Sequence, residues 1–243
     1  MKSDPASRVG VPRRANTRQI LAAAEHVFGR HGFHGASMMD IAREAGLPKA
    51  NIHYYFGTKE DLYRAVLEHI LSEWLHDADM WLQPDNTARA GFEGYIRAKM
   101  AFSRKRPDAS RLFAYEVLQG APNVYPYLST TLRTHVQGLG TTFDVWKQRG
   151  EMRPDVDSNH LMFALWGMTQ TYADMSAQMG AVLGRRSLTN QDHDTSIRTI
   201  LTLVLDSCTT APSVALPDGV VHVPTPKPRR RADPAPHLTE RSS

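Results

Sequence analysis

The sequence from residue 37 to residue 62, SMMDIAREAGLPKANIHYYFGTKEDL, decides the fold. Ser37 and Thr58 are each followed three residues later by an aspartate, which is the spacing of a helix N-cap and its capping partner. A glycine ends each of the two apolar-periodic runs between them. The stretch therefore predicts two short helices, residues 37–45 and 49–55, followed by a longer helix that begins after Thr58.

Helical patterns extend on both sides of this stretch. Apolar residues recur at three- and four-residue spacing from Asn16 to Gly32, and again after Thr58 through about Met80. No strand-length alternation with hairpin turns occurs anywhere in the chain. Proline or glycine separates the remaining helical stretches, which are expected at residues 88–106, 109–119, 125–149, 158–179 and 192–209. The sequence therefore predicts an all-α protein of about nine helices.

The composition is that of an ordinary globular chain. Of its 243 residues, 41% are hydrophobic and 22% are charged, which excludes wholesale disorder. The longest nearly uninterrupted apolar run, residues 161–168, is less than half of a membrane span, and the first fifteen residues lack the apolar core of a secretory signal. The one cysteine, Cys208, cannot form an internal disulfide. We therefore expect a cytoplasmic protein that does not associate with a membrane.

The two ends of the chain differ from the helical body. Residues 1–13 are polar and contain Pro5, Gly10 and Pro12, so we expect a flexible basic arm. Residues 211–243 hold seven of the fifteen prolines and a cluster of arginines. Such a segment cannot bury enough apolar surface to offset its ordering entropy, and we expect a disordered tail. The arginine cluster either contacts DNA phosphates or only keeps the chain soluble.

Charge is unevenly distributed along the chain. Residues 1–60 contain nine lysines and arginines and five acidic residues, a net charge of +4, whereas residues 61–210 contain fifteen and seventeen, a net charge of −2. A basic first quarter favours an acidic partner for the N-terminal part, with nucleic acid as the first candidate. Because the excess is small, a basic solvated surface is the alternative.

The order of cap, short helix, turn and second short helix is that of a helix-turn-helix. Residues 37–45 would brace residues 49–55 in the major groove of DNA. This signal is weak alone, because short helix pairs occur in many proteins that do not bind DNA. The residues that sharpen it are Gly32-Phe33, Ile41-Ala42, Ala45-Gly46, Tyr54-Tyr55-Phe56, Lys59 and Leu62. With these residues at these spacings, the stretch from Arg14 to Trp74 resembles the DNA-binding domain of the TetR family of bacterial repressors.

The resemblance implies a domain organisation and two partners. Residues 14–74 would bind a palindromic double-stranded DNA operator, and residues 75–210 would bind a small effector and form a homodimer. Residues 158–179 and 192–209 are long and apolar, and we expect them to form the dimer interface. The implied DNA contacts are Ser37, Lys49, Ala50, Asn51, His53, Tyr54, Tyr55 and Lys59.

The chemistry of these side chains suits DNA. Asn51 can pair with adenine through two hydrogen bonds, and Lys49 can reach guanine or a phosphate. Tyr54 would pack or touch DNA, whereas Tyr55 would lie at the DNA backbone. Lys59 lies in the first turn of a helix, where the helix dipole disfavours a cation, and an external phosphate would explain its presence there. The alternative to DNA contact for the polar residues is an ordinary solvated face. The alternative for the two tyrosines is that their rings wedge the short helix in place.

One position departs from the family pattern. Many TetR-family proteins have serine or threonine directly before the recognition helix, where the side-chain oxygen caps the helix. Here the residue is Pro48, which has no capping oxygen but tolerates the first helical turn. The sequence therefore places the start of the recognition helix only to within about one residue.

The second domain is similar to a pyrimidine-responsive branch of the family. The similar stretches are residues 70–75, 109–113, 120–122 and 165–174. This likeness implies a pyrimidine effector such as uracil, with Trp74, Trp166 and Gln170 as its contacts. Trp166 and Gln170 share a helix face at i and i+4, an indole can stack on a planar ring, and a glutamine amide matches the N–H and C=O edge of uracil. A purely structural role for the tryptophans and a different aromatic or hydrophobic effector are the alternatives.

An enzyme is the competing class, and its signatures are missing. The sequence contains no GxSxG, GxxxxGK[ST] or HExxH motif. His31 and His34 have no further ligand pair nearby, so we expect no metal site and no cofactor. A helical protein-interaction module without DNA binding is the other alternative. It would explain the helices but not the basic, doubly capped N-terminal motif.

Overall fold

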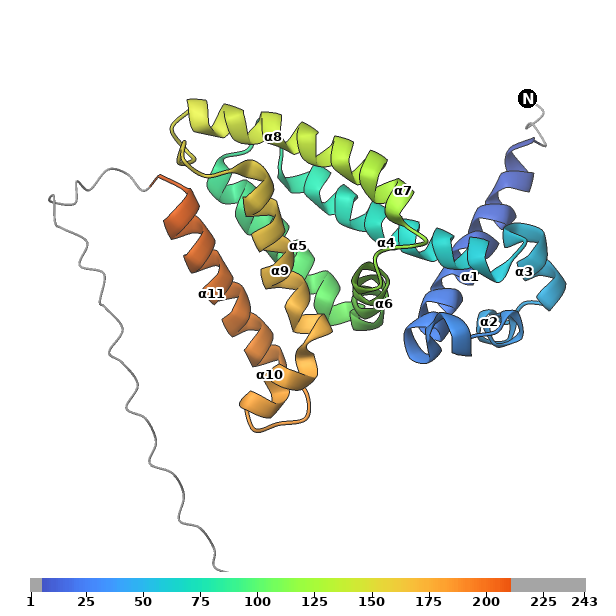
Figure 1. Cartoon of the computed structure of the whole chain (residues 1–243). Coiled ribbons are helices and arrows are strands. Elements are labelled where there is room, and N and C mark those ends of the chain that lie inside the picture. The colour runs from blue at the N-terminus through green and yellow to red at the C-terminus, as the bar shows by residue number, and fades with distance from the viewer. Residues whose placement is uncertain (1–5, 211–243) are drawn as a thin grey trace, which may run out of the picture. The chain divides into compact units, whose positions relative to one another are not determined.

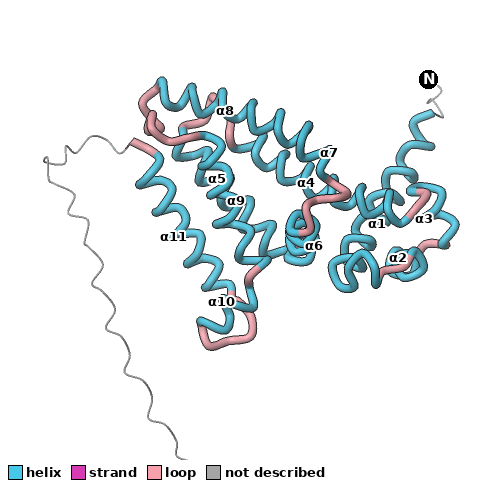
Figure 2. Tube along the Cα trace, in the orientation of Figure 1, coloured by secondary structure: helices cyan, strands magenta, loops and turns pink. Residues whose placement is uncertain are grey.

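The computed structural model describes residues 6–210, and it describes their side chains from residue 15 onward. In this part of the chain every regular element is helical, as Figure 2 shows, and an isolated β-bridge joins Met152 to Thr209. None of the described helices is long and apolar enough to cross a membrane. In chain order the helices are α1 (Ala6–Gly35), α2 (Met38–Ala45), α3 (Lys49–Phe56), α4 (Lys59–Trp81), α5 (Ala88–Lys105), α6 (Pro107–Leu118), α7 (Tyr125–Tyr127), the π-helical segment η1 (Leu128–Leu132), α8 (Arg133–Gln148), α9 (Ser158–Asp174), α10 (Ser176–Val182) and α11 (Asn190–Cys208).

The all-α prediction is confirmed, and the expected number of helices is close. Helices α7 and α8 are joined through η1 without a break, so together they correspond to the single helix predicted at residues 125–149. The helix predicted at residues 158–179 is instead two helices, because Met175 leaves the helical conformation at φ −111° and ψ 22°. Thr189 accepts a hydrogen bond from the Asp192 amide, so α11 begins two residues before the expected start.

The N-terminal boundary of α1 differs from the sequence prediction. Residues 6–13 were expected to belong to a flexible arm, but the helix begins at Ala6. That part of the prediction is wrong because extending an existing helix needs no new nucleus, so a long helix can continue through Gly10 and Pro12. Residues 1–5 and the predicted tail, residues 211–243, lie outside the described residues.

The caps at the start of α2 and α4 follow the sequence closely. The Ser37 hydroxyl accepts a hydrogen bond from the Asp40 amide, and Thr58 and Asp61 form a reciprocal capping box. Gly46 has a left-handed conformation, φ 61° and ψ 29°, which ends α2. Pro48 precedes α3 without a side-chain cap, so the recognition helix begins at Lys49.

Two hydrophobic cores meet along α4. In the first core, helices α1 to α4 pack against α6, and the buried residues include Ile52, Trp74 and Phe113. In the second core, α5 packs against α8, α9 and α11 around Trp146. Helix α4 leads from α1–α3 to the other helices without interruption (Figure 1), and its Ala78 belongs to the second core. The boundary expected after residue 74 therefore falls inside a continuous helix.

Candidate functional site

Helix α3 has one buried residue and a solvent-exposed face opposite to it. Ile52 is fully buried in the first core and anchors the helix. Lys49, Ala50, His53 and Tyr54 are exposed, and their i, i+3 and i+4 spacing places them on one side of the helix. This face combines a cation, an imidazole, a small residue and a phenol ring. It contains four of the eight residues that the sequence predicted to contact DNA.

The two tyrosines of α3 have different surroundings. Tyr54 is 76% exposed, whereas Tyr55 is half-buried and packs against the first core. The Asn16 side chain of α1 donates a hydrogen bond of 3.2 Å to the Tyr55 hydroxyl. The ring that wedges the helix is thus Tyr55, and the ring that points outward is Tyr54. The exposed Tyr54 agrees with the expectation that it touches DNA, and the wedging role, which was the alternative for the pair of rings, falls to Tyr55.

The other predicted contacts lie around this face and also have local structural partners. Asn51 is half-buried on its flank. The Nδ1 atom of His53 lies 2.7 Å from the Gly57 carbonyl oxygen at the end of α3. Ser37 is exposed and caps α2, and its hydroxyl group holds the pKa of the Asp40 carboxyl below its usual value.

Lys59 has internal partners. Its ammonium group donates hydrogen bonds to the carbonyl oxygens of Phe33, at 2.9 Å, and Ala36, at 3.1 Å, and it lies 4.5 Å from the centre of the Phe33 ring. These carbonyls follow Gly32, where the backbone leaves the helical conformation at φ 66° and ψ 175°, so they lie in the short stretch that leads from the regular part of α1 to α2. These internal partners explain the position of Lys59 without an external phosphate, so the helix-dipole argument for a phosphate contact no longer applies. One of its three donors remains for another acceptor.

A cavity of about 660 Å³ lies between α4, α5, α6, α8, α9 and η1. Trp74, Trp166 and Gln170, the three residues that the sequence predicted to bind a ligand, all line it. They come from α4 and α9, which are far apart in the sequence. Apolar side chains form most of the remaining wall, among them Leu71, Leu75, Leu118, Leu128 and Leu132.

The polar atoms of the three predicted residues are not used equally by the protein. The Trp166 indole N–H donates a hydrogen bond of 3.0 Å to the Tyr95 hydroxyl. The Trp74 indole nitrogen is buried and has no hydrogen-bond partner, although its ring packs edge-on against Phe102 and Phe113. Gln170 is half-buried and makes no hydrogen bond with the described part of the chain.

Lys99 is a cavity residue that the sequence-based prediction left out. It is only 2% exposed, and its ammonium nitrogen lies 3.9 Å from the centre of a Trp74 ring. Burial lowers the pKa of Lys99 to about 7, against the opposing effect of Asp77 and Asp174. The sequence shows only a lysine one residue before Met100; its burial, which is rare for lysine without a role, is visible only in the structure.

Family profiles match nearly all of the described chain. Residues 20–66 match the bacterial regulatory proteins of the tetR family, and residues 67–211 match the C-terminal region of YcdC-like proteins. The chain belongs to the TetR family of transcriptional regulators.

Relatives of known sequence agree with this assignment. The HTH-type transcriptional regulator RutR of Escherichia coli strain K12 is 40% identical over 170 residues, which cover 70% of this chain and 79% of RutR. The HTH-type transcriptional repressor SCO4008 of Streptomyces coelicolor is 26% identical over 169 residues, 70% of this chain and 83% of SCO4008. The predicted resemblance is thereby confirmed.

Solved structures agree on the fold. The ketosteroid transcriptional regulator KstR2 of Mycobacterium tuberculosis superposes with a TM-score of 0.61 at 15% identity, over 80% of this chain and 95% of KstR2. The fatty acid degradation regulator FadR of Bacillus halodurans superposes with a TM-score of 0.60 at 16% identity, over 84% of this chain and 97% of FadR.

TetR-family proteins are regulators that bind DNA operators and small-molecule effectors, usually as dimers, and they are not enzymes. This decides against the interaction-module alternative.

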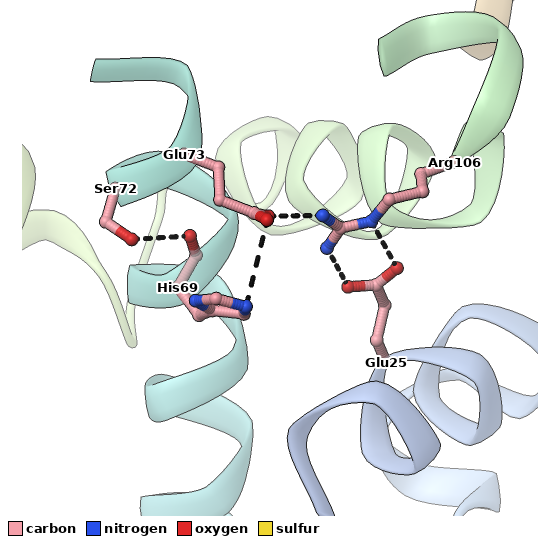
Figure 3. A network of polar contacts seen from close by, with 5 residues as sticks. All are labelled: Glu25, His69, Ser72, Glu73 and Arg106. Atoms are coloured by element: carbon pink, nitrogen blue, oxygen red, sulfur yellow. Dashed lines mark hydrogen bonds and ion pairs between the residues drawn. The ribbon is translucent and has the colours of Figure 1, made fainter. Parts of the chain in front are cut away.

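A network of ion pairs joins the DNA-binding helices of this TetR-family regulator to the helices around the cavity. Arg106, between α5 and α6, donates hydrogen bonds to the carboxylates of Glu25 on α1 and Glu73 on α4 (Figure 3). Its Nε atom lies 3.1 Å from a Glu25 oxygen. The Nε2 atom of His69 lies 4.0 Å from the same carboxylate of Glu73. Because Glu73 directly precedes Trp74, the network adjoins the cavity wall.

We predict that Lys59→Ala lowers the free energy of unfolding by about 1–3 kcal/mol, since two charge-assisted hydrogen bonds to carbonyl oxygens are lost. Lys49→Ala is the matched control, because Lys49 is exposed at the start of α3 and should change stability by less than about 0.5 kcal/mol. Urea unfolding followed by circular dichroism measures both. Equal stability of the two variants would show that the Lys59 contacts contribute nothing to the fold.

Proposed function

We propose that the chain is a homodimeric repressor that binds a palindromic DNA operator and is released from it by a small planar molecule, a pyrimidine such as uracil. One observation carries this proposal. A single cavity collects Trp74, Trp166 and Gln170, and one of its walls is α4, the helix that continues directly from the DNA-binding part. A molecule bound there would press on the element that positions α3.

The DNA half of the proposal rests on the outward face of α3. Lys49 and Tyr54 are exposed and available for phosphates or bases, and Asn51 lies at the edge of the same face. A helix of this length contacts only a few base pairs, so two copies on a two-fold axis are needed for adequate specificity. The outer sides of α9 and α11 supply apolar residues for a dimer interface, with Phe163 53% exposed and Leu203 56% exposed.

The ligand half of the proposal rests on the free polar atoms of the cavity. The buried Trp74 N–H has no partner, and the Lys99 amine lies over the Trp74 ring, so two residues of the cavity wall carry donors that no protein acceptor uses. Uracil has two carbonyl acceptors that could meet these donors, while the Gln170 amide could pair with an N–H and C=O edge. Stacking on an indole face would hold the ring in place.

A larger aromatic or hydrophobic effector is the second candidate. The cavity volume of about 660 Å³ lies within the range of drug-sized ligand pockets and leaves space around a single pyrimidine ring. Its leucine-rich wall favours apolar surface on the ligand. Both candidates use the same cavity, and a ligand screen separates them.

Two substitutions in α3 test the DNA contacts. Lys49→Ala should weaken binding to specific and random DNA alike and should make the salt dependence shallower by about one unit, because one phosphate contact is lost. Asn51→Ala should change base preference by about 1–3 kcal/mol at one position, as expected for a bidentate contact. Fluorescence anisotropy over a salt series, with operator and random duplexes, measures both effects. If the two variants lose affinity equally on both duplexes, the division between phosphate and base contacts is incorrect.

A thermal-shift screen against nucleobases and other aromatic metabolites tests the effector. Uracil at about 100 times its dissociation constant should stabilise the protein by about 2.7 kcal/mol per site, and a true effector should also release operator DNA. Gln170→Ala and Trp166→Phe should reduce the shift, whereas Gln178→Ala, an exposed change on α10, should leave it intact. The absence of any shift with millimolar uracil or thymine would reject the pyrimidine, and a shift that survives the two cavity substitutions would place the ligand elsewhere.

A further inference from the structure

A second cavity, of about 540 Å³, lies where the C-terminal ends of α5 and α9 meet the segment between α10 and α11. It shares Arg111 and Asp174 with the effector cavity but has a different chemical character. Three arginines, Arg104, Arg111 and Arg186, line it, and Asp174 is its single acidic residue. The excess of positive charge indicates a site for an anion rather than for an apolar molecule.

Two of the three arginines are available for a ligand. Arg111 is held in place by the protein, because three of its five N–H groups donate hydrogen bonds, to the Ala173 carbonyl at 3.1 Å, to Asp108 at 3.1 Å and to Ser176 at 3.0 Å. Arg104 and Arg186 form no hydrogen bond or ion pair with any residue in the described part of the chain. Their planar guanidinium groups can each donate two parallel hydrogen bonds to one oxyanion.

His193 adds a buried polar atom to the same cavity. Its side chain lines the cavity, the residue is 8% exposed, and its Nδ1 atom is buried without a hydrogen-bond partner. Leaving such an atom unpaired is unfavourable, and a bound group that pairs with it would remove the penalty. Burial, followed by the nearby charge of Arg104, lowers the pKa of His193, which favours the neutral ring, a form with one N–H donor and one acceptor nitrogen.

The segment that holds Arg186 is fixed by its neighbours. The Arg185 amide donates a 2.8 Å hydrogen bond to the Gly180 carbonyl, and the Arg185 side chain forms an ion pair of 3.0 Å with Asp192. A Cβ atom at Gly180 would lie 2.7 Å from the Arg185 carbonyl oxygen, so the close approach depends on glycine. Arg186 therefore starts from a defined backbone position at the rim of the cavity.

We propose that this second cavity binds a phosphate-bearing small molecule, with Arg104 and Arg186 on the phosphate oxygens and His193 as a further donor. A phosphate monoester offers three strong acceptor oxygens and up to two negative charges, which suit two guanidinium groups and one N–H. The cavity is larger than a bare phosphate ion requires, so the rest of the molecule would occupy the part nearer the effector cavity. Asp174 faces both cavities, and its carboxylate already accepts a 2.7 Å hydrogen bond from Ser110.

Isothermal titration calorimetry with ribose 5-phosphate and with inorganic phosphate, at constant ionic strength, tests this proposal. We expect saturable binding of ribose 5-phosphate, and we expect the Arg104→Gln/Arg186→Gln double variant to bind it at least about tenfold more weakly, since charge-assisted hydrogen bonds are lost. Arg89→Gln is the control, because Arg89 is exposed at the opposite end of α5; it should bind like the wild-type protein.

Two results would overturn the proposal: no saturable binding of either probe at millimolar concentration, or equal binding by the wild-type protein and the double variant. The second result would mean that the probe binds at another place on the protein. Both substitutions change exposed residues, and circular dichroism confirms that the double variant folds. The thermal shift produced by an effector in the first cavity is measured on the same variant and should persist, so a failure of this site is distinguishable from a failure of the proposed effector.

Discussion

The ion pairs of Arg106 are the interaction on which the arrangement of this regulator depends. One guanidinium group joins α1, α4 and the junction of α5 with α6 (Figure 3). The Arg106 side chain is 30% exposed and that of Glu25 13% exposed, so the charges are partly removed from water and their loss would leave uncompensated partners. Within the described residues, no other ion pair links α1 to α5 or α6.

The position of Glu73 in the sequence, directly before Trp74, connects the Arg106 ion pairs to the cavity wall. Glu73 accepts from Arg106 on one side of α4, and the next residue, Trp74, forms part of the cavity wall. Helix α4 belongs to both hydrophobic cores and has no break between them. A ligand changes the DNA-competent population only by its differential affinity for the two forms. A small displacement of α4 by a molecule in the cavity would alter the ion pairs and the position of α3 together.

Much of the helical structure could be predicted from the sequence, because the residues at helix ends act locally. Caps such as Ser37 and Thr58 and the terminating Gly46 determine where short helices begin and end, independently of the rest of the chain. Trp74, Trp166 and Gln170 came from a resemblance, which the family match now supports, and they line one cavity.

What could not be predicted depends on contacts between residues far apart in the chain. Lys59 was assigned to a phosphate because the carbonyls of Phe33 and Ala36 lie 26 and 23 residues away in sequence and cannot be placed beside it by periodicity. The burial of Lys99 and the packing of Tyr55 against the first core have the same origin. Local patterns identify a helix, whereas the packing of its neighbours decides which side chain is free.

The most direct test of the account is the ratio of operator dissociation constants with and without saturating uracil, measured for the wild-type protein, Arg106→Gln and Arg97→Gln. Arg97 forms an exposed ion pair with Glu93 on α5 and serves as the control. We expect a ratio of about 5–150 for the wild-type protein, the usual range of allosteric coupling, the same ratio for Arg97→Gln, and a ratio close to one for Arg106→Gln although it still binds uracil. An unchanged ratio in Arg106→Gln would contradict the claim that this residue couples the cavity to the DNA-binding helices.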